Sequence, residues 1–151
     1  MKVFGLFLLI FLLSACNEAP EETITLSEVD FAEHLVVSKV IENRSDPNLS
    51  KGVTDQELAQ SVLEKVKGLS VVEHEVDDVA EKLRKEDYYM FTFNDEQMES
   101  GDVPSYHFVA FTDGKIAFYF EDVDQEWEPR VTVDAQKALI EEIKRLVKVD
   151  F

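Results

Sequence analysis

Cys16 is the only cysteine of the chain, and it stands where a thiol has neither a disulfide partner nor a folded core around it. It follows an apolar run, Val3–Leu13, and the two small residues Ser14 and Ala15. With Lys2 before the run, this layout is typical of a secretory signal peptide. The run is too short for a transmembrane helix, which needs about 20 apolar residues. The segment is therefore predicted to be a secretory signal rather than a structural element.

The segment LSAC, from Leu13 to Cys16, resembles the lipobox of bacterial lipoproteins. The resemblance implies a diacylglyceryl group on the Cys16 sulfur, which makes Cys16 a lipid attachment point rather than a catalyst, and a signal peptide (residues 1–15) cleaved directly before it. The segment after Cys16 begins polar and acidic, so residues 16–30 are predicted to be the lipidated cysteine and a tether. It also implies a lipid-anchored protein at the extracytoplasmic face of the cell membrane, because two acyl chains anchor a protein stably. An ordinary cleaved signal with an incidental cysteine and an uncleaved anchor are the alternatives.

A second group of residues suited to chemistry is an acidic stretch with the sequence EDVDQEWE. Its carboxylates are Glu121, Asp122, Asp124, Glu126 and Glu128. Oxygen ligands at this density could hold a calcium ion. An EF-hand loop counted from Asp122 requires Gly at its sixth position and Glu at its twelfth, where this chain has Trp127 and Val133. The stretch is therefore predicted to be a solvated loop, and binding of a divalent cation or small ligand by the acidic loops is the alternative.

No residue pattern for nucleophilic, zinc-dependent or phosphate chemistry is found in the sequence. It contains neither a G-x-S-x-G elbow nor a phosphate-binding glycine loop. The segment HEVDD from His74 is not the H-E-x-x-H motif, because Asp78 occupies the place of the second histidine. His34, His74 and His107 are far apart, and His107 is expected opposite Phe120 in a hairpin, partly buried. The sequence predicts a protein that is not an enzyme and has no cofactor and no resident metal.

Trp127, the single tryptophan, is the candidate binding residue. A tryptophan in an acidic loop can anchor a protein partner. More commonly such a ring folds back over apolar surface, which here would be the outer face of the neighbouring hairpin. Both roles remain open for Trp127.

The charge balance limits the class of partner. The chain of 151 residues has 32 acidic and 15 basic side chains, a formal net charge of −17. Because phosphate backbones are bound by clustered cations, nucleic acid is excluded as a partner. Residues 31–151 suffice for one domain with its own core.

Three segments have the apolar spacing of amphipathic helices. In the first, Thr54 and Glu57 form a capping-box pattern, and Gly68 suits the C-terminal cap. A second, shorter helix is expected over Val76–Leu83. Asp134 is expected to cap the third and last helix.

Runs of β-branched and aromatic residues predict strands over His34–Glu42, Tyr88–Phe93, the hairpin Ser105–Phe120 and the short Arg130–Val133. In the hairpin, Asp113 and Gly114 are expected to form a two-residue turn with Thr112 opposite Lys115. Both faces of this hairpin are apolar, so both should be covered. The polar segment of residues 43–52 is predicted to be a loop.

This order of elements predicts an α+β fold, a two-layer sandwich in which two main amphipathic helices cover one face of an antiparallel sheet. In outline, residues Ile24 to Phe151 resemble the small uncharacterised lipoproteins of Bacillus-like bacteria, including those with a YhfM-like domain. The resemblance rests on element order and hydrophobic pattern, and it implies an extracytoplasmic accessory protein without catalytic residues. We expect a non-catalytic binding or interaction module tethered to the membrane through Cys16.

Overall fold

The computed structural model describes residues 19–95, 104–122 and 125–151, without the side chains of residues 122, 125 and 126. The expected signal peptide and Cys16 lie outside these residues. The helices and strands are, in chain order, β1 (Glu22–Thr23), β2 (His34–Ile41), β3 (Arg44–Val53), α1 (Gln56–Val66), β4 (Ser70–Glu73), α2 (Val76–Lys85), β5 (Tyr88–Asn94), β6 (Tyr106–Phe111), β7 (Ile116–Asp122), β8 (Gln125–Thr132) and α3 (Lys137–Leu146).

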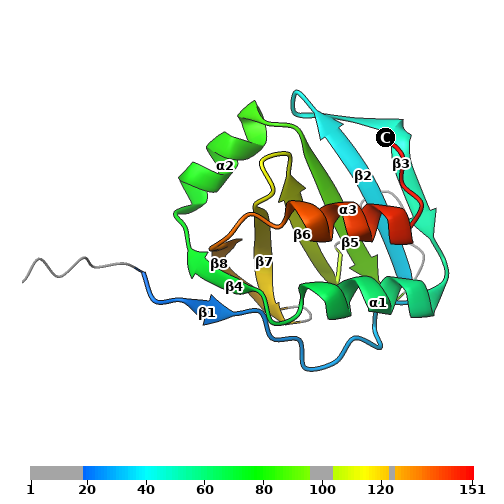
Figure 1. The fold of residues 1–151 in the computed structure, drawn as a ribbon, viewed down its shortest axis with the longest axis horizontal. Helices are drawn as coiled ribbons and strands as arrows, with labels where there is room; N and C mark the ends of the chain where they lie inside the picture. Colours follow the sequence, from blue (N-terminus) through cyan, green and yellow to red (C-terminus); the bar gives the residue numbers. More distant parts are fainter. Residues whose placement is uncertain (1–18, 96–103, 123–124) are drawn as a thin grey trace, which may run out of the picture.

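The strands form one sheet in the order β1-β4-β8-β7-β6-β5-β2-β3 (Figure 1). Every neighbouring pair in this order is antiparallel. The centre of the sheet is the meander β5 to β8, whose strands follow one another directly in the chain. The predicted α+β fold with an antiparallel sheet is confirmed.

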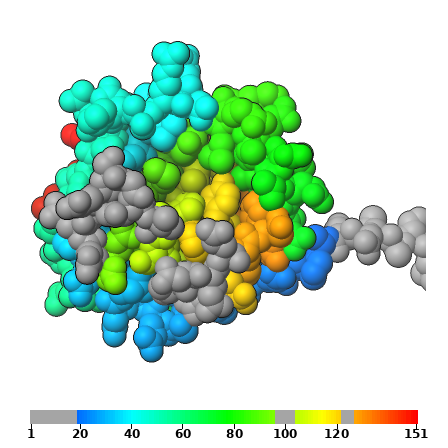
Figure 2. Space-filling model, turned by 180° about the vertical axis from the view of Figure 1, so that it is seen from behind, coloured from blue at the N-terminus to red at the C-terminus, as the bar shows by residue number. Residues whose placement is uncertain are grey.

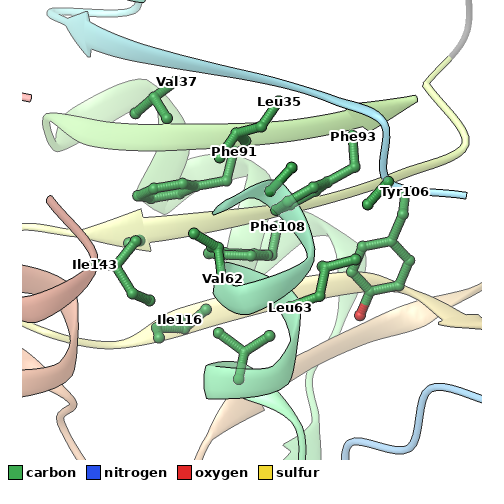
Figure 3. Close-up of a cluster of buried hydrophobic side chains, with 14 of the residues drawn as sticks. Leu35, Val37, Val62, Leu63, Phe91, Phe93, Tyr106, Phe108, Ile116 and Ile143 are labelled. Carbon is green, nitrogen blue, oxygen red and sulfur yellow. The ribbon is translucent and has the colours of Figure 1, made fainter. Parts of the chain in front are cut away.

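Helices α1 and α3 lie on one face of the sheet and enclose the main core (Figures 1 and 3). Their buried side chains, such as Val62 and Ile143, pack on alternate residues of the central strands. Among these, the rings of Phe91 and Phe108 stack with centroids 4.7 Å apart. Burial of large aromatic groups of this kind contributes much of a fold's hydrophobic stabilisation.

Helix α2 packs on the opposite face of the sheet. Its buried Val79 joins a second, smaller cluster with Val109, Phe111, Ala117 and Val131. Because neighbouring residues of a strand point to opposite faces, Val109 and Ala117 belong to this cluster, while the residues beside them belong to the main core. Figure 2 shows α2, in green, beside the central strands on this side of the molecule. Both faces of the predicted hairpin are thus apolar and packed.

Residues 43–52 were predicted to be a loop, and this prediction is wrong, because they form most of β3. Ile41 pairs with Arg44 across a turn in which Glu42 and Asn43 have φ of 50° and 59°. Positive φ at both central residues is the mark of a type I′ hairpin turn. Strand β3 lacks an alternating hydrophobic pattern because it is the exposed edge of the sheet. Its polar residues and Pro47 disfavour pairing with a further strand.

The central hairpin has a register one residue away from the predicted one. Val109 pairs with Ala117 and Ala110 with Ile116. The loop therefore contains three residues, 112–114, and the Phe111 N–H donates to the Lys115 carbonyl oxygen. Gly114 has a φ of 100°, which suits the last position of a three-residue hairpin loop.

The folded domain also begins earlier than residue 31. Within the expected tether, β1 pairs with β4, and Ile24 and Leu26 are only 1% and 2% exposed. Any flexible tether thus ends before Glu22. The apolar Ile24 and Leu26 supply this burial, but three residues are too few for their spacing to predict it.

Two helix caps differ from the prediction, and the last strand is longer. Asp55, rather than Thr54, caps α1, since its side chain accepts from the Leu58 N–H at 3.1 Å. Helix α3 begins after Gln136 without a side-chain cap, so Asp134 lies outside it. Strand β8 starts before the predicted Arg130–Val133 because Pro129 is accommodated in an irregularity of the ladder.

Candidate functional site

A groove with a volume of about 390 Å³ lies between α2 and the sheet face that α2 covers. The residues that line it are Val76, Val79, Ala80, Leu83, His107, Tyr119, Phe120, Trp127, Glu128 and Pro129. Most of them are apolar or aromatic, and a few carry polar atoms. Ligand pockets commonly have this composition and volumes of about 300–1,000 Å³.

One wall of the groove comes from a bulge in β8. Phe118 pairs with Arg130 and Phe120 with Glu126, so a single residue of β7, Tyr119, faces residues 127–129 of β8. Pro129 has no N–H and therefore cannot donate to the strand ladder. Its carbonyl oxygen accepts from the His74 N–H at 2.9 Å. Bulges redirect side chains and are common beside binding sites. Here the bulge brings residues 127–129 to the groove.

Arg130 holds Trp127 in place. Its guanidinium lies 4.7 Å from the centre of the indole ring, a cation–π contact. The same guanidinium forms ion pairs with Glu22 at 2.9 Å and Glu73 at 2.8 Å, and the Arg130 side chain is only 10% exposed. Arg130 also donates to the Glu128 carbonyl oxygen at 2.9 Å. The bulge is thus tied to β4 and to the N-terminal strand β1.

Three buried polar atoms of the groove residues have no hydrogen-bond partner within the described part of the chain. They are Nδ1 of His107, the hydroxyl oxygen of Tyr119 and Nε1 of Trp127. The imidazole of His107 stacks on Tyr119 at 5.1 Å between centroids and meets Phe120 edge-on at 4.9 Å. Buried polar atoms are nearly always paired, so each of the three suggests a place for a ligand atom or a water molecule.

These groups are neutral near pH 7. Burial lowers the pKa of His107 below its usual 6.5. Burial, with a smaller contribution from Tyr88, raises the pKa of Tyr119 to about 12. Among the described residues that line the groove, the exposed Glu128 is the single carboxylic acid, and none is a lysine or an arginine. The side chains that line the groove therefore carry unpaired O–H and N–H groups in apolar surroundings, and a ligand atom that reaches them would pair with them.

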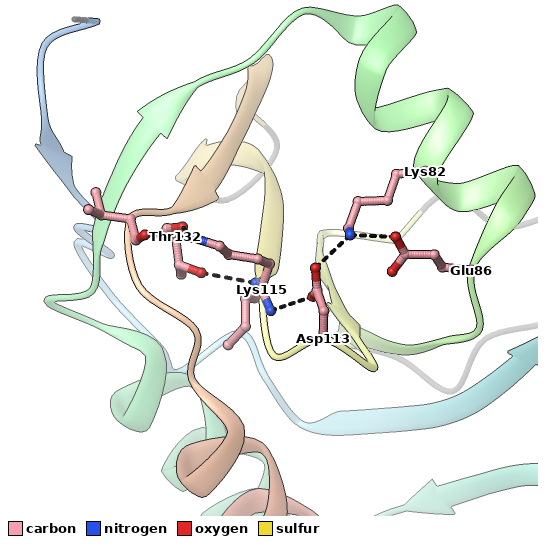
Figure 4. Close-up of polar contacts among 7 residues, drawn as sticks. Lys82, Glu86, Asp113, Lys115 and Thr132 are labelled. Carbon is pink, nitrogen blue, oxygen red and sulfur yellow. Dashed lines mark hydrogen bonds and ion pairs between the residues drawn. The ribbon is translucent and has the colours of Figure 1, made fainter.

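Lys82 attaches α2 to the loop of the central hairpin (Figure 4). Its ammonium donates to Asp113 and to Glu86, both at 2.7 Å, and lies 4.7 Å from the ring centre of Phe111. Burial acts against the charged forms, but these hydrogen bonds prevail: the pKa of Lys82 is raised and that of Asp113 is lowered. Lys115, directly after this loop, donates to the Thr132 carbonyl oxygen at 3.0 Å.

Of the other residues that the sequence singled out, the two remaining histidines and Glu121 do not line this groove. His34 borders a different depression, beside Thr92 and Asn94, and His74 is exposed between β4 and α2. Of the acidic stretch, Glu121 and Glu128 are exposed, whereas the side chains of residues 122, 124 and 126 lie outside the description. Within the described ranges, no group of three or more His, Cys, Asp or Glu could hold a metal ion.

Trp127 is partly buried, packs against the main core and also lines the groove. Its role as an anchor for a protein partner stays a prediction. Sequence reasoning missed its neighbours Tyr119 and Arg130 and placed His107 opposite Phe120. The available signal was Pro129 between strand-forming residues, because an internal proline favours an edge or a bulge.

No described helix is long and apolar enough to cross a membrane. No family model, curated protein or solved structure matches the chain.

Proposed function

We propose that this chain is a lipid-anchored extracytoplasmic protein whose domain binds a small molecule in the groove beneath α2, without catalysing a reaction on it. The observation that carries the binding role is the groove itself, with three buried and unpaired polar atoms among apolar walls. A cluster of polar groups that a fold leaves unsatisfied costs stability, and a ligand that pairs with them offsets this cost. This arrangement favours a small ligand over a divalent cation.

The lipid anchor is supported by the lipobox-like LSAC and by the short distance from Cys16 to the fold. Five residues lie between Cys16 and Glu22, the first residue of β1, so six Cα–Cα steps join the two. A chain of this length spans about 20 Å at most. A lipid on Cys16 would thus hold β1 close to the membrane surface, with β8 and its bulge two strands away.

Replacement of Cys16 by Ser tests the anchor. The wild-type protein should enter the detergent phase in a phase-partition experiment, and Cys16→Ser should remain in the aqueous phase or as unprocessed precursor. Asn17→Ser is the matched control, because it places the same side chain one residue later and keeps the thiol. If Cys16→Ser is processed and still enters the detergent phase, lipidation is refuted.

A groove-filling substitution tests the binding role. Ala80 lines the groove, whereas the adjacent Glu81 is exposed on the other side of α2. A library of small fragments is screened by NMR against the complete chain carrying Cys16→Ser, with the single indole N–H of Trp127 as the reporter. Ala80→Phe should remove the shifts that fragments induce, and Glu81→Phe should retain them. Equal shifts in the two variants would place binding elsewhere.

A further inference from the structure

We infer that the groove is selective for a neutral ligand with a flat apolar body and one or two hydrogen-bond-accepting oxygens, such as a carbonyl. This inference rests on the proposed binding role of the groove and specifies the class of ligand. It follows from the donors that the groove presents, from its charge and from the side chains that line it.

The unpaired polar atoms are mainly donors. The indole nitrogen of Trp127 can only donate, and the hydroxyl of Tyr119 stays protonated at neutral pH. His107 is neutral at this pH, so its unpaired Nδ1 either donates or accepts, according to the tautomer. A ligand that satisfies Trp127 and Tyr119 together must supply acceptor atoms, and a ligand with donors alone leaves the indole N–H unpaired.

The charge of the surroundings favours a neutral ligand. The groove offers no cationic side chain among its described lining residues that could pair with a buried anion. The exposed Glu128 and the net charge of −17 oppose anions further. A cation could pair with Glu128 only at the exposed part of the groove, and beside the buried donors of Tyr119 and Trp127 its charge would remain unpaired.

The lining side chains favour a flat apolar body. Tyr119, Phe120 and Trp127 supply rings from the sheet side, and Val79 and Leu83 supply aliphatic groups from α2. Aromatic side chains pack well against flat apolar groups in offset or edge-on arrangements. The volume of about 390 Å³ lies near the lower end of the range for ligand pockets, which suits a compact molecule.

Four probes that share a benzene ring separate these requirements: acetophenone (neutral, with a carbonyl), ethylbenzene (no acceptor), benzoate (anionic) and benzylammonium (cationic). Each is titrated by NMR into the complete chain carrying Cys16→Ser, with the Trp127 indole and the Ala80 amide as reporters. Acetophenone should bind about fivefold more tightly than each of the others, because it alone gains a hydrogen bond without burying a charge. Its oxygen should also move the indole proton downfield.

Two variants assign the hydrogen bonds. Tyr119→Phe and Trp127→Phe each keep a ring, and each should reduce the affinity for acetophenone toward that for ethylbenzene, read from the Ala80 amide. Tyr89→Phe is the control, because it loses a hydroxyl on the opposite face of the sheet.

The outcomes separate the two proposals. If no probe shifts either reporter, the groove does not bind small molecules and both proposals fail. If ethylbenzene binds as tightly as acetophenone, or if a charged probe binds best, the ligand class is wrong while the groove remains a binding site. Unchanged affinity for acetophenone in both ring-preserving variants would likewise overturn the assigned class.

Discussion

The imidazole of His107 on β6 lies against the phenol ring of Tyr119 on β7, with centroids 5.1 Å apart and an angle of 25° between the ring planes. Each ring carries a buried polar atom without a hydrogen-bond partner in the described chain. An unsatisfied buried polar group costs about 1–3 kcal/mol. The groove is therefore a locally destabilised part of an otherwise well-packed sheet, as binding sites often are.

Removal of the Tyr119 hydroxyl should stabilise the protein. In Tyr119→Phe the ring packing is retained and the cost of burying the hydroxyl disappears, so the free energy of unfolding should rise by about 1 kcal/mol. Urea denaturation measures this as a higher midpoint at unchanged slope.

The same change at Tyr89 should have the opposite effect. The Tyr89 hydroxyl donates to the Phe151 carbonyl oxygen at 2.7 Å and accepts from Lys144 at 2.9 Å. Tyr89→Phe should lower the free energy of unfolding by about 1 kcal/mol, since these bonds are partly exposed. A loss of stability in Tyr119→Phe as large as that in Tyr89→Phe would mean that Tyr119 is paired, for example to bound water.

His107 should make the protein less stable as the solution becomes acidic. Burial lowers its pKa in the folded state below the usual 6.5, so the unfolded chain binds the proton more tightly. This contribution to stability is fully present above pH 6.5 and is lost as the pH falls through the folded pKa. Tyr119 stays neutral throughout this range, because its pKa is about 12.

This effect is measured by urea denaturation of the wild type and of His107→Phe between pH 7.5 and 5. The variant retains a ring at this position but cannot bind the proton. The difference in stability between the two should shift in favour of the variant as the pH falls. Replacement of the exposed His74 by Phe controls for the loss of one imidazole. A parallel pH dependence of wild type and His107→Phe would show that protonation of His107 is not linked to unfolding.

The parts of the fold that could be predicted from sequence are those in which buried side chains recur at the period of a helix or of a strand. Ile140 and Ile143 of α3 share a helix face, and Phe91 and Phe93 of β5 share a strand face, so their spacing indicates both the element and its buried side. Strand β3 lacks such a period because it is an exposed edge.

The groove could not be predicted in the same way. It depends on a one-residue difference in the loop after Phe111 and on the bulge opposite Tyr119, and both are decided by pairing between strands. A shift of one residue changes which side chains lie opposite each other. That shift moves His107 from a place opposite Phe120 to one beside Tyr119.

Valine substitutions at Gly114 and Gly52 test the loop of the central hairpin, because a side chain is strained at the first position and has free space at the second. A side chain at Gly114 would have a φ of +100° and a Cβ only 2.6 Å from Cγ of Lys137 and 3.3 Å from its backbone nitrogen. At Gly52 no heavy atom lies within 4 Å of the added Cβ. Gly114→Val should lose about 2 kcal/mol or more through backbone strain, and Gly52→Val should change little. Equal melting temperatures would contradict the assigned loop.

The Lys82 side chain should contribute both to the stability of the protein and to the affinity of the groove for its ligand. Lys82→Met keeps the aliphatic stem but removes the ammonium that binds Asp113 and Glu86. Because the Lys82 side chain is 25% exposed, solvent screens these ion pairs, and we expect a loss of about 1 kcal/mol in the free energy of unfolding. Since α2 supplies one wall of the groove, acetophenone should also bind more weakly to this variant.

Lys85→Met is the matched control on the same helix. Lys85 forms an ion pair only one turn away, with Glu81, and the two side chains are 69% and 55% exposed. Such a pair contributes little to stability and does not touch the sheet, so both the urea midpoint and the affinity for acetophenone should stay close to those of wild type. Urea denaturation and NMR titration of the two variants decide the matter. If Lys82→Met weakens binding no more than Lys85→Met does, the wall of the groove formed by α2 is held by apolar packing of Val79 and Leu83 rather than by the contact between Lys82 and Asp113.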